Sequence, residues 1–403
     1  MKLLLSHRFF WPDTSPYALM LRAMGDHFAS AGHKVQVLTS VPSYRDGAVK
    51  APRRERLGSL DVRRAWVFSR EKARPFRRFA NIILYCSKLF GRILHARPDI
   101  VIASTFPPVI AAWTASFAAR LTGARFVYHM QDIHPEVSQI SGHVLGKRLP
   151  ARISLALDNQ TLRRSAAIVV LSEDMAATLG ARGLGALPIR VINNFSLSAD
   201  TAQSHVPPES LEKPGGVRRL IFAGNLGRFQ NLAALTEGIS RLFGRYPDLE
   251  LMFLGDGSAK AALERDWGGH PQVKFAPFLP FSQAQELIRT ADVGLVALAP
   301  GIYRVAYPSK LLTYAQLGVA VLALVEPESA LARDIRERGL GVVPKSDDPR
   351  DIAEALDELL ASADRREALA AFAADTAQPS VALSRWDALL KGLGSEKGGS
   401  AAT

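Results

Sequence analysis

Two segments in the second half of the chain contain residues suited to binding a phosphate group. The first, Phe222–Asn231 (FAGNLGRFQN), carries Gly224 and Gly227, whose missing side chains let the backbone approach a ligand closely. Arg228 adds a guanidinium that can bind a phosphate through two N–H groups. The alternative is an ordinary glycine-containing turn between a strand and a helix.

The second segment, Tyr307–Tyr314, has the residue order of a helix start. Pro308 suits the first turn, Ser309 can act as the N-cap, and Lys310 lies where the free N–H groups of that turn point outward. The pattern suits a diphosphate. A plain N-cap followed by a solvated lysine has the same sequence, so this alternative stays open.

Other nucleotide and metal chemistries lack their motifs. The first apolar run is followed by His7–Pro12, which has no G-x-G-x-x-G turn, so a dinucleotide site of the NAD type is not expected. There is no G-x-x-x-x-G-K-[ST] sequence, and no Cys/His cluster or H-E-x-x-H spacing that predicts a metal held by the protein. A third tight turn, Leu254–Ser258, follows another apolar run and contains Gly255 and Asp256.

The elements that position these segments form two alternating arrays of short apolar runs and longer helical patterns. Such alternation is typical of βαβ units with parallel sheets covered by helices. The fold class is therefore α/β, with two Rossmann-like parallel-sheet domains whose carboxyl strand edges face a cleft, where ligands of such sheets bind. The predicted strands are Lys2–Ser6, Lys34–Thr39, Asp99–Thr105, Arg125–His129, Ala166–Ser172, Arg218–Ala223, Glu250–Gly255, Gln272–Ala276, Asp292–Leu298 and Val319–Val325.

The length of 403 residues also favours two domains. We expect an N-terminal domain over residues 1–197, a Pro/Gly/Ser-containing linker over 198–217 and a C-terminal domain over 218–378. A final helix over 379–392 is expected to return to the first domain, and a Gly/Ser/Ala-rich tail over 393–403 is expected to be disordered.

Composition excludes several classes of protein. The chain has 48% apolar residues and a single cysteine, which favours a globular protein of a reduced, cytosolic compartment. No apolar run reaches the length of a signal peptide or of a membrane span. The net charge of +12 is uneven, because residues 1–200 hold 28 basic and 13 acidic side chains and residues 45–97 alone hold 15 and 4. A block of this kind indicates an anionic partner.

The basic block includes a predicted amphipathic helix. Phe79, Ile82, Ile83, Cys86, Phe90, Ile93 and Leu94 share one face, and Arg74, Arg77, Arg78, Lys88 and Arg92 lie beside it. This pattern is typical of a helix that lies in a membrane surface, and five basic groups at about 1 kcal/mol each would hold it there. The alternative is a domain helix that buries its apolar face. Nucleic acid is the less favoured partner, because no known reader motif is present.

Further segments follow one another in an order that points to a family. They are Phe10–Asp13, Ala31–His33, Val41–Tyr44, Arg97–Val101, Ser104–Pro108, His129–Glu136 (HMQDIHPE), Val191–Asn194, Ala291–Leu298 and Pro308–Ala323. With the glycine turns described above, they resemble the retaining GT-B glycosyltransferases of family 4. The resemblance extends to the branch that includes the fucosamine transferases of bacterial capsule and O-antigen synthesis, and it covers nearly the whole chain.

The resemblance implies transfer of a sugar from a nucleotide diphosphate sugar, UDP-linked in the usual case, to a lipid-linked or saccharide acceptor with retained anomeric configuration. It also implies a metal-independent enzyme without a cofactor, at the inner face of the cell membrane. Polyprenyl-linked acceptors are found in that leaflet, which agrees with the predicted membrane helix. The positions that would bind the donor are Gly224, Asn225, Arg228, Gly255, Asp256, Ser309, Lys310, the Leu311 amide and Glu326.

For catalysis, the resemblance implies that the leaving phosphate receives the acceptor proton. Asp132 and Glu136 would orient or deprotonate the acceptor hydroxyl, and His129 would contact the donor sugar. The alternative for these three residues is a structural network at the strand ends.

The chain departs from the family pattern at several positions. Two glutamates that many members carry, before and within the Pro-Ser-Lys helix, are replaced by Val305 and Thr313. Asn225 and Asn231 replace a phosphate-binding arginine and lysine, for which Arg228 could compensate. A catalytically silent sugar-nucleotide-binding or scaffold protein and a non-hydrolysing UDP-sugar epimerase therefore remain as alternatives.

Overall fold

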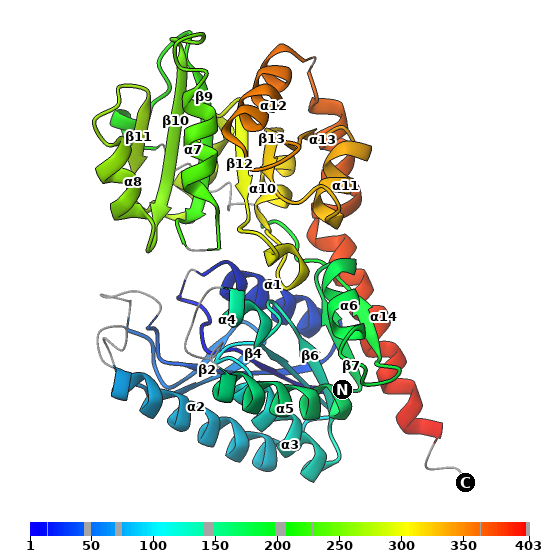
Figure 1. Cartoon of the computed structure of the whole chain (residues 1–403). Coiled ribbons are helices and arrows are strands. Elements are labelled where there is room, and N and C mark those ends of the chain that lie inside the picture. The colour runs from blue at the N-terminus through cyan, green and yellow to red at the C-terminus, as the bar shows by residue number, and fades with distance from the viewer. Residues whose placement is uncertain are drawn as a thin grey trace. The chain divides into compact units, whose positions relative to one another are not determined.

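The computed structural model describes residues 1–13, 15–43, 50–68, 75–140, 148–197, 207–227, 229–362 and 364–399, apart from the side chains of residues 75 and 396–399. The chain forms two compact units (Figure 1). Unit 1 consists of Met1–Asn194 and Ala382–Thr403, and unit 2 consists of Phe195–Val381. The chain therefore leaves unit 1 and returns to it at its end.

Unit 1 is built on an eight-stranded sheet of order β3-β4-β2-β1-β5-β6-β7-β8. All neighbouring strands are parallel except β3 and β4, which form an antiparallel hairpin. The strands are β1 (Lys2–Ser6), β2 (Lys34–Ser40), β3 (Arg54–Leu57), β4 (Leu60–Ala65), β5 (Ile100–Ser104), β6 (Arg125–His129), β7 (Ala167–Val170) and β8 (Ile189–Val191). Because the order reverses at β1, the crevice at the carboxyl ends of β1 and β5 is the expected ligand position of this sheet.

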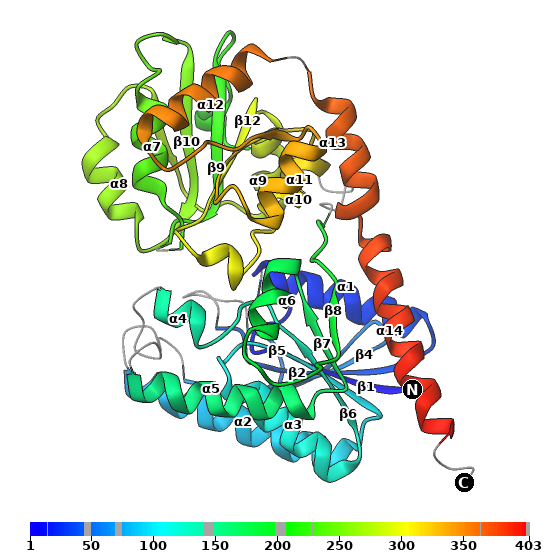
Figure 2. The ribbon, with the colours of Figure 1, turned by 45° about the vertical axis from the view of Figure 1, so that its right-hand side comes forward.

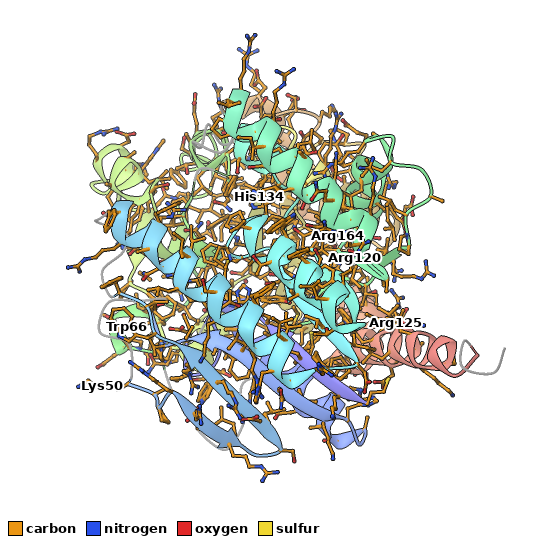
Figure 3. All side chains as sticks on the ribbon, turned by 90° about the horizontal axis from the view of Figure 1, so that it is seen from below. Lys50, Trp66, Arg120, Arg125, His134 and Arg164 are labelled. Carbon is orange, nitrogen blue, oxygen red and sulfur yellow. The ribbon has the colours of Figure 1, made fainter. Side chains whose placement is uncertain are left out.

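Helices cover the sheet of unit 1 on both faces. They are α1 (Pro16–Ser30), α2 (Pro75–Ala96), α3 (Ile110–Thr122), α4 (Glu136–Ile140), α5 (Arg148–Arg164), α6 (Glu173–Gly180) and α14 (Pro379–Gly399). The helices α2, α3 and α5 run side by side beneath the sheet, as Figure 3 shows from below. Helix α1 begins where the Ser15 hydroxyl accepts a hydrogen bond from the Ala18 N–H, with Pro16 in the first turn.

The C-terminal helix α14 packs on unit 1. Trp386 is 1% exposed and lies edge to face against Phe28 of α1, with ring centroids 6.3 Å apart. Next to it, the Asp387 carboxylate and the His27 ring are 2.8 Å apart. Burying an indole of this size contributes several kcal/mol, so α14 is part of the core of unit 1.

Unit 2 has a six-stranded parallel sheet of order β11-β10-β9-β12-β13-β14 (Figure 2). The strands are β9 (Arg218–Asn225), β10 (Leu249–Asp256), β11 (Val273–Ala276), β12 (Val293–Ala297), β13 (Ala320–Leu324) and β14 (Gly341–Val342). The helices are α7 (Leu232–Ser240), α8 (Lys260–Trp267), α9 (Phe281–Arg289), α10 (Lys310–Gln316), α11 (Ala330–Glu337), α12 (Pro349–Ala361) and α13 (Arg366–Phe372). Leu, Ile and Phe side chains of β9, β10, β12, α7 and α12 form one continuous core.

The α/β fold class with two parallel-sheet domains, predicted from the sequence, is confirmed. All ten predicted strands are present within two residues of their expected bounds, and β3, β4, β8 and β14 are additional. The sequence did not predict the hairpin β3–β4, because arginines interrupt its apolar pattern. Arg64, on the inner side of β4, is buried through an ion pair with Glu55 of β3 rather than through an apolar side chain.

Two expected boundaries differ from the structure. Residues 207–217 do not form a free linker, because the Arg219 guanidinium bonds the Leu211 and Glu212 carbonyls and holds this stretch on unit 2; residues 198–206 lie outside the described part. The final helix continues to Gly399 rather than ending at 392, since Leu390 and Leu393 are buried. Tertiary packing here overrides the low helix propensity of the glycines.

Candidate functional site

The carboxyl edge of the sheet in unit 2 forms a glycine-lined cradle. The register pairs Gly224 of β9 with Gly255 of β10, and both have positive φ angles, of 124° and 139°. A Cβ atom on Gly255 would lie 2.0 Å from the Gly224 carbonyl oxygen, so a side chain cannot be accommodated there. The two turns can therefore approach each other, and a ligand above them, only as glycines.

Lys310 of α10 lies across this cradle. A Cβ atom on Gly224 would be 3.2 Å from the Lys310 Cε, and the Lys310 Nζ lies 4.7 Å from the centre of the Phe222 ring. Removal from solvent lowers the pKa of Lys310 to about 8. A cation with few competing water contacts, held over two glycine turns, is suited to a diphosphate.

The N-terminus of α10 differs in one respect from the sequence prediction. Ser309 occupies the N-cap position, but its hydroxyl makes no capping hydrogen bond, because its φ and ψ of −66° and −5° are helical rather than extended. The hydroxyl is therefore not used by the helix. The Leu311 N–H belongs to the first turn, whose N–H groups have no partners within the helix.

Asn225 and Asp256 shape the two turns. The Asp256 carboxylate accepts a 2.8 Å hydrogen bond from the Gly257 N–H, and the Asp256 carbonyl accepts one from the Leu226 N–H. The Asn225 side chain lies against Gly227 and Gly257. Both residues are at the expected donor edge, where Asp256 acts on the turn and the exposed Asn225 amide remains suited to a ligand.

Glu326, expected to bind the donor, follows β13 at the same edge. Its carboxylate accepts a hydrogen bond from the Gly301 N–H, and it lines a shallow pocket of about 180 Å³ together with Pro300 and Val325. Asn231 also lines that pocket and donates a hydrogen bond to Asp347. The pocket is apolar with a few acceptors, as a nucleoside requires.

In unit 1, the strand register brings Ser104 of β5 and His129 of β6 to one edge of the sheet. The buried His129 ring is 2.9 Å from the Tyr17 hydroxyl through Nδ1 and 3.0 Å from the Gln131 Nε2 through Nε2. Because Asn194 donates to the Gln131 Oε1, the Gln131 amide donates to His129 Nε2, which leaves the proton of the neutral ring on Nδ1. Burial lowers the pKa of His129 to about 3, so the ring stays neutral at physiological pH.

His7 extends this network. It follows β1, and its Nδ1 hydrogen-bonds to the Ser104 hydroxyl, while its ring packs edge to face on Tyr17 with centroids 4.6 Å apart. Burial lowers the pKa of His7 to about 3. Sequence reasoning did not select His7, Tyr17 or Gln131. Their place beside the carboxyl ends of β1 and β5, the switch point of the sheet, is the signal that could have found them.

Asp132 lies three residues beyond the end of β6. Its carboxyl is desolvated, which raises its pKa to about 6. Among the described residues no hydrogen bond or ion pair to this carboxylate is found. A carboxylate of this kind can accept a hydrogen bond from a substrate hydroxyl.

Glu136 is bound differently from Asp132. Both of its oxygens accept hydrogen bonds from the Arg182 guanidinium, at 2.9 and 2.7 Å. Arg182 also bonds the buried Asp158 at 2.6 Å, and Asp158 accepts a hydrogen bond from Tyr128. This saturated ion-pair network favours the structural alternative for Glu136, with Arg182 holding the segment after β6 in place.

The residues expected to contact a membrane lie on α2, apart from Arg74, which lies outside the described residues. The helix does not present one continuous apolar face. Tyr85, Cys86, Leu89 and Ile93 are buried against unit 1, whereas Phe76, Phe79 and Ile83 are 81%, 62% and 50% exposed. Ile82 and Phe90 are half-buried, and Phe90 stacks on Phe117 of α3.

The basic residues of α2 also divide into two groups. Arg78 and Lys88 are exposed and Arg77 is half-buried, but Arg92 is buried and bonds Gln36. The expectation that Arg92 lies beside the apolar face at the surface is wrong, because its guanidinium is directed to β2 and β4.

Three further points concern the site. Arg228, expected at the donor phosphates, lies outside the described residues. Within the described ranges, no three His, Cys, Asp or Glu side chains come together as a metal site. In the same ranges no helix is both long and apolar enough to cross a membrane.

Comparisons with known proteins agree with this arrangement. Residues 17–194 match the model of the glycosyl transferase 4-like domain, and residues 217–362 match that of the glycosyl transferases group 1. The two models together match about four fifths of the chain and coincide with the two units.

Two curated relatives span most of the chain. One is WcaI of Escherichia coli (strain K12), a glycosyl transferase named for colanic acid biosynthesis, with 25% identity over 83% of this chain and 85% of its own. The other is WbjE of Pseudomonas aeruginosa, named as a glycosyltransferase, with 24% identity over 73% and 72%.

Solved structures share the fold. Sucrose-phosphate synthase from Thermosynechococcus elongatus superposes with a TM-score of 0.73 at 13% identity, over 98% of this chain and 99% of that one. HepE from Anabaena, in complex with UDP and glucose, gives a TM-score of 0.66 at 15% identity, over 97% and 100%. The two-domain architecture is thus that of the GT-B glycosyltransferases. The chain belongs to family 4 of these enzymes.

Proposed function

We propose that the protein transfers a sugar from a UDP-linked donor to a lipid-linked or saccharide acceptor in the synthesis of a surface polysaccharide or glycolipid, with retained anomeric configuration. The relatives WcaI and HepE support this proposal through the colanic acid biosynthesis and the UDP complex in their names. The fucosamine-transferase branch resembles the chain most in its segment after β6 and supplies the first donors to test.

The observation that carries the proposal is Lys310 over the paired turns of Gly224 and Gly255. The cradle has no room for side chains. The Lys310 amine over it is desolvated, and the Ser309 hydroxyl at the start of α10 makes no capping hydrogen bond. We infer that the diphosphate of the donor binds here. Asn225 and Arg228 would contact its oxygens, and Glu326 would accept hydrogen bonds from the ribose through its second oxygen.

The transfer step follows from these roles. The acceptor oxygen forms a bond to the anomeric carbon of the sugar, on the face from which the UDP departs. The bond between the anomeric carbon and the phosphate oxygen breaks, and its electron pair leaves with UDP. Lys310 and the Leu311 N–H stabilise that developing charge, and the departing phosphate oxygen takes the acceptor proton, so no further base is needed.

Unit 1 supplies the acceptor side. Asp132 would accept a hydrogen bond from the reacting hydroxyl and orient it. Both ring nitrogens of the neutral His129 are already hydrogen-bonded, so His129 would act at the donor sugar by holding Tyr17 and Gln131 in place rather than as an acid. Glu136 would act through Arg182 on the position of this segment. No metal ion or cofactor is part of this proposal.

We also place the enzyme at the inner face of the cell membrane, through α2. The exposed Phe76, Phe79 and Ile83 with Arg77 and Arg78 provide the apolar and basic groups that an interfacial helix uses. A lipid-linked acceptor in that membrane would then be close at hand.

Two other functions are alternatives to this proposal. Val305 is buried and cannot hydrogen-bond a sugar, and with Thr313 it motivates a silent donor-binding protein. A UDP-sugar epimerase has the same two-domain shape, but the match of both units to glycosyltransferase models speaks against it.

Incubation with a panel of radiolabelled UDP-sugars and bacterial membrane lipid tests the proposal. The expected result is label in the organic phase with one donor, and no label with Lys310→Met. UDP binding without transfer from any donor would favour the silent protein, and epimerised donor without acceptor would favour the epimerase. Proton NMR of the product, read against the donor, tests retention.

A further inference from the structure

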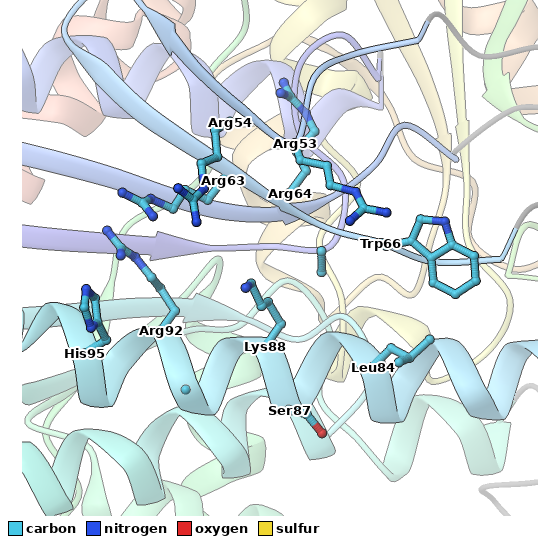
Figure 4. Close-up of a pocket in the computed structure, with 12 residues that line it drawn as sticks. Arg53, Arg54, Arg63, Arg64, Trp66, Leu84, Ser87, Lys88, Arg92 and His95 are labelled. Carbon is cyan, nitrogen blue, oxygen red and sulfur yellow. The ribbon is translucent and has the colours of Figure 1, made fainter.

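A basic groove lies in unit 1 between the hairpin β3–β4 and α2 (Figure 4). Its volume is about 660 Å³. Six cationic side chains line it, four from the hairpin and its approach and two from the helix. They are Arg53, Arg54, Arg63, Arg64, Lys88 and Arg92.

The positive charge of the groove is only partly neutralised. Two carboxylates pair with three of the six cations: Glu55 with Arg64, and Asp61 with Arg63 and Arg92. No ion pair to Arg53, Arg54 or Lys88 is found among the described residues. The crowding has an electrostatic effect, because burial together with the charges of Arg63 and Arg54 lowers the pKa of Arg92.

Two of the lining arginines also have one N–H group each without a hydrogen-bond partner. Arg64 and Arg92 are 3% and 8% exposed, and the Nε–H of each has no acceptor in the described part of the chain. Buried N–H donors are nearly always paired, and an unpaired one costs about 1–3 kcal/mol.

One end of the groove is apolar. Trp66 and Leu84 line it and are 45% and 37% exposed, and Figure 4 shows them at the end away from Arg92 and His95. The groove thus combines a cluster of cations with an adjoining apolar surface.

We propose that this groove is a binding site for the phosphate headgroup of a membrane lipid, whose acyl or prenyl chain lies over Trp66 and Leu84. The inference deepens the membrane attachment proposed above: a helix lying on a bilayer needs no groove, whereas this site recognises a single lipid. A nucleic acid would need several exposed aromatic rings for its bases, and the groove offers only Trp66.

Binding of a soluble lipid tests the groove without a bilayer. The probe is dihexanoyl phosphatidic acid below its micelle concentration, measured by isothermal titration calorimetry on the full chain at low salt. Arg54→Glu with Lys88→Glu is expected to weaken binding at least tenfold, because both side chains are exposed and unpaired. The matched control Arg120→Glu with Arg163→Glu makes the same charge change on α3 and α5 and is expected to leave binding unchanged.

The other ligands distinguish the sources of the anion. Inorganic phosphate and dihexanoyl phosphatidylcholine are expected to bind at least tenfold more weakly than the phosphatidic acid. Equal binding of inorganic phosphate, equal loss in the control variant, or displacement of the lipid by poly(U) at lower concentration would overturn the proposal.

The test also separates the groove from the membrane attachment and from the enzyme activity. Phe76→Ser, Phe79→Ser and Ile83→Ser together should abolish sedimentation with anionic vesicles and leave binding of the soluble lipid intact. Loss of soluble-lipid binding in that variant would contradict a groove site. Lipid binding is measured without a sugar donor, so absence of transferase activity does not affect its outcome.

Discussion

Two ionisable side chains of the candidate site have pKa values moved toward neutrality. Burial raises the pKa of Asp132 in unit 1 to about 6 and lowers that of Lys310 in unit 2 to about 8. At pH 7 both are mainly charged, one as an anion for the acceptor hydroxyl and one as a cation for the diphosphate. His7 and His129, with pKa values of about 3, keep one charge state across this range.

Donor affinity should therefore fall as the pH rises through 8. In the proposed site the diphosphate binds the ammonium form of Lys310. At pH 9 only about a tenth of the protein molecules have this side chain protonated, so the dissociation constant of UDP should rise about tenfold from pH 7 to pH 9. Lys310→Arg keeps its charge and should remove this dependence. Calorimetry at several pH values measures both; an equal pH dependence in the two proteins would exclude Lys310 as its source.

Acceptor chemistry should be lost at the opposite end of the pH range. Below pH 6 the Asp132 carboxylate becomes protonated and no longer accepts a hydrogen bond as an anion from the acceptor hydroxyl. The kcat/KM for the acceptor should therefore fall tenfold per pH unit below that value. Asp132→Asn should lower kcat by about 10²–10⁴-fold at pH 7 and leave UDP affinity unchanged. Asp26→Asn, which changes a half-buried carboxylate of α1 that pairs with Arg22, is the control; equal losses in both variants would contradict a role at the substrate.

At the scale of the elements, the paired turns after β9 and β10 are the feature on which the proposed donor binding depends. Gly224 and Gly255 lie opposite each other in the register, and α10 brings Lys310 over them from farther along the chain. The position of the Lys310 amine thus depends on the close approach of its Cε to the backbone of Gly224, which has no side chain.

Gly224→Ala should displace Lys310 and weaken UDP binding by at least tenfold. The new methyl group would lie 3.2 Å from the Lys310 Cε, and the alanine would have to adopt a φ of 124°. Gly318→Ala is the matched control, since Gly318 also has a positive φ, of 71°, but no atom lies within 4 Å of its Cβ position. Both variants should lose stability from strain of about 1–3 kcal/mol, and only the first should lose UDP affinity. Equal affinities would show that the contact is not needed.

Sequence patterns predicted the elements better than they predicted the contacts. Apolar runs marked ten of the parallel strands, but not β4, β8 and β14, and the glycine spacing marked the turns after β9 and β10. The hairpin β3–β4 was missed because Arg64 pairs across it with Glu55, and a buried ion pair leaves no apolar periodicity. The positions of His7 and Tyr17 at the site depend on the pairing of β1 with β5, whose partner residues are 97 positions apart in the sequence, and no local pattern contains this pairing.

At the scale of the whole molecule, the net charge of +12 is concentrated in unit 1. Part of this charge lines the groove beside α2, and part lies with the exposed Phe76, Phe79 and Ile83 on that helix. The side of unit 1 formed by α2 thus carries both the basic and the exposed apolar side chains that the proposed membrane attachment requires.

Removal of the apolar component should release the protein from membranes. Phe76→Ser, Phe79→Ser and Ile83→Ser are expected to reduce sedimentation with phosphatidylglycerol vesicles by at least tenfold, since each removes an exposed side chain that would insert between lipids. Leu121→Ser, Phe278→Ser and Phe281→Ser remove three other exposed apolar side chains and serve as the control. Charge reversal at Arg77 and Arg78 should have the same effect at low salt only. Unchanged sedimentation of the α2 variants would exclude this helix.

The return of α14 to unit 1 has a consequence for synthesis of the chain on the ribosome. Unit 1 begins at the first residue, but Trp386, which covers Phe28 and lies 4.9 Å from the His129 ring, is made near the end. Unit 2 is complete at Val381 and can fold before unit 1 acquires its last helix. The surroundings of His129 and Phe28 are therefore completed only after residue 386 has been synthesised and α14 has packed on unit 1, and until then the nascent first half exposes the apolar surface that Trp386 later covers.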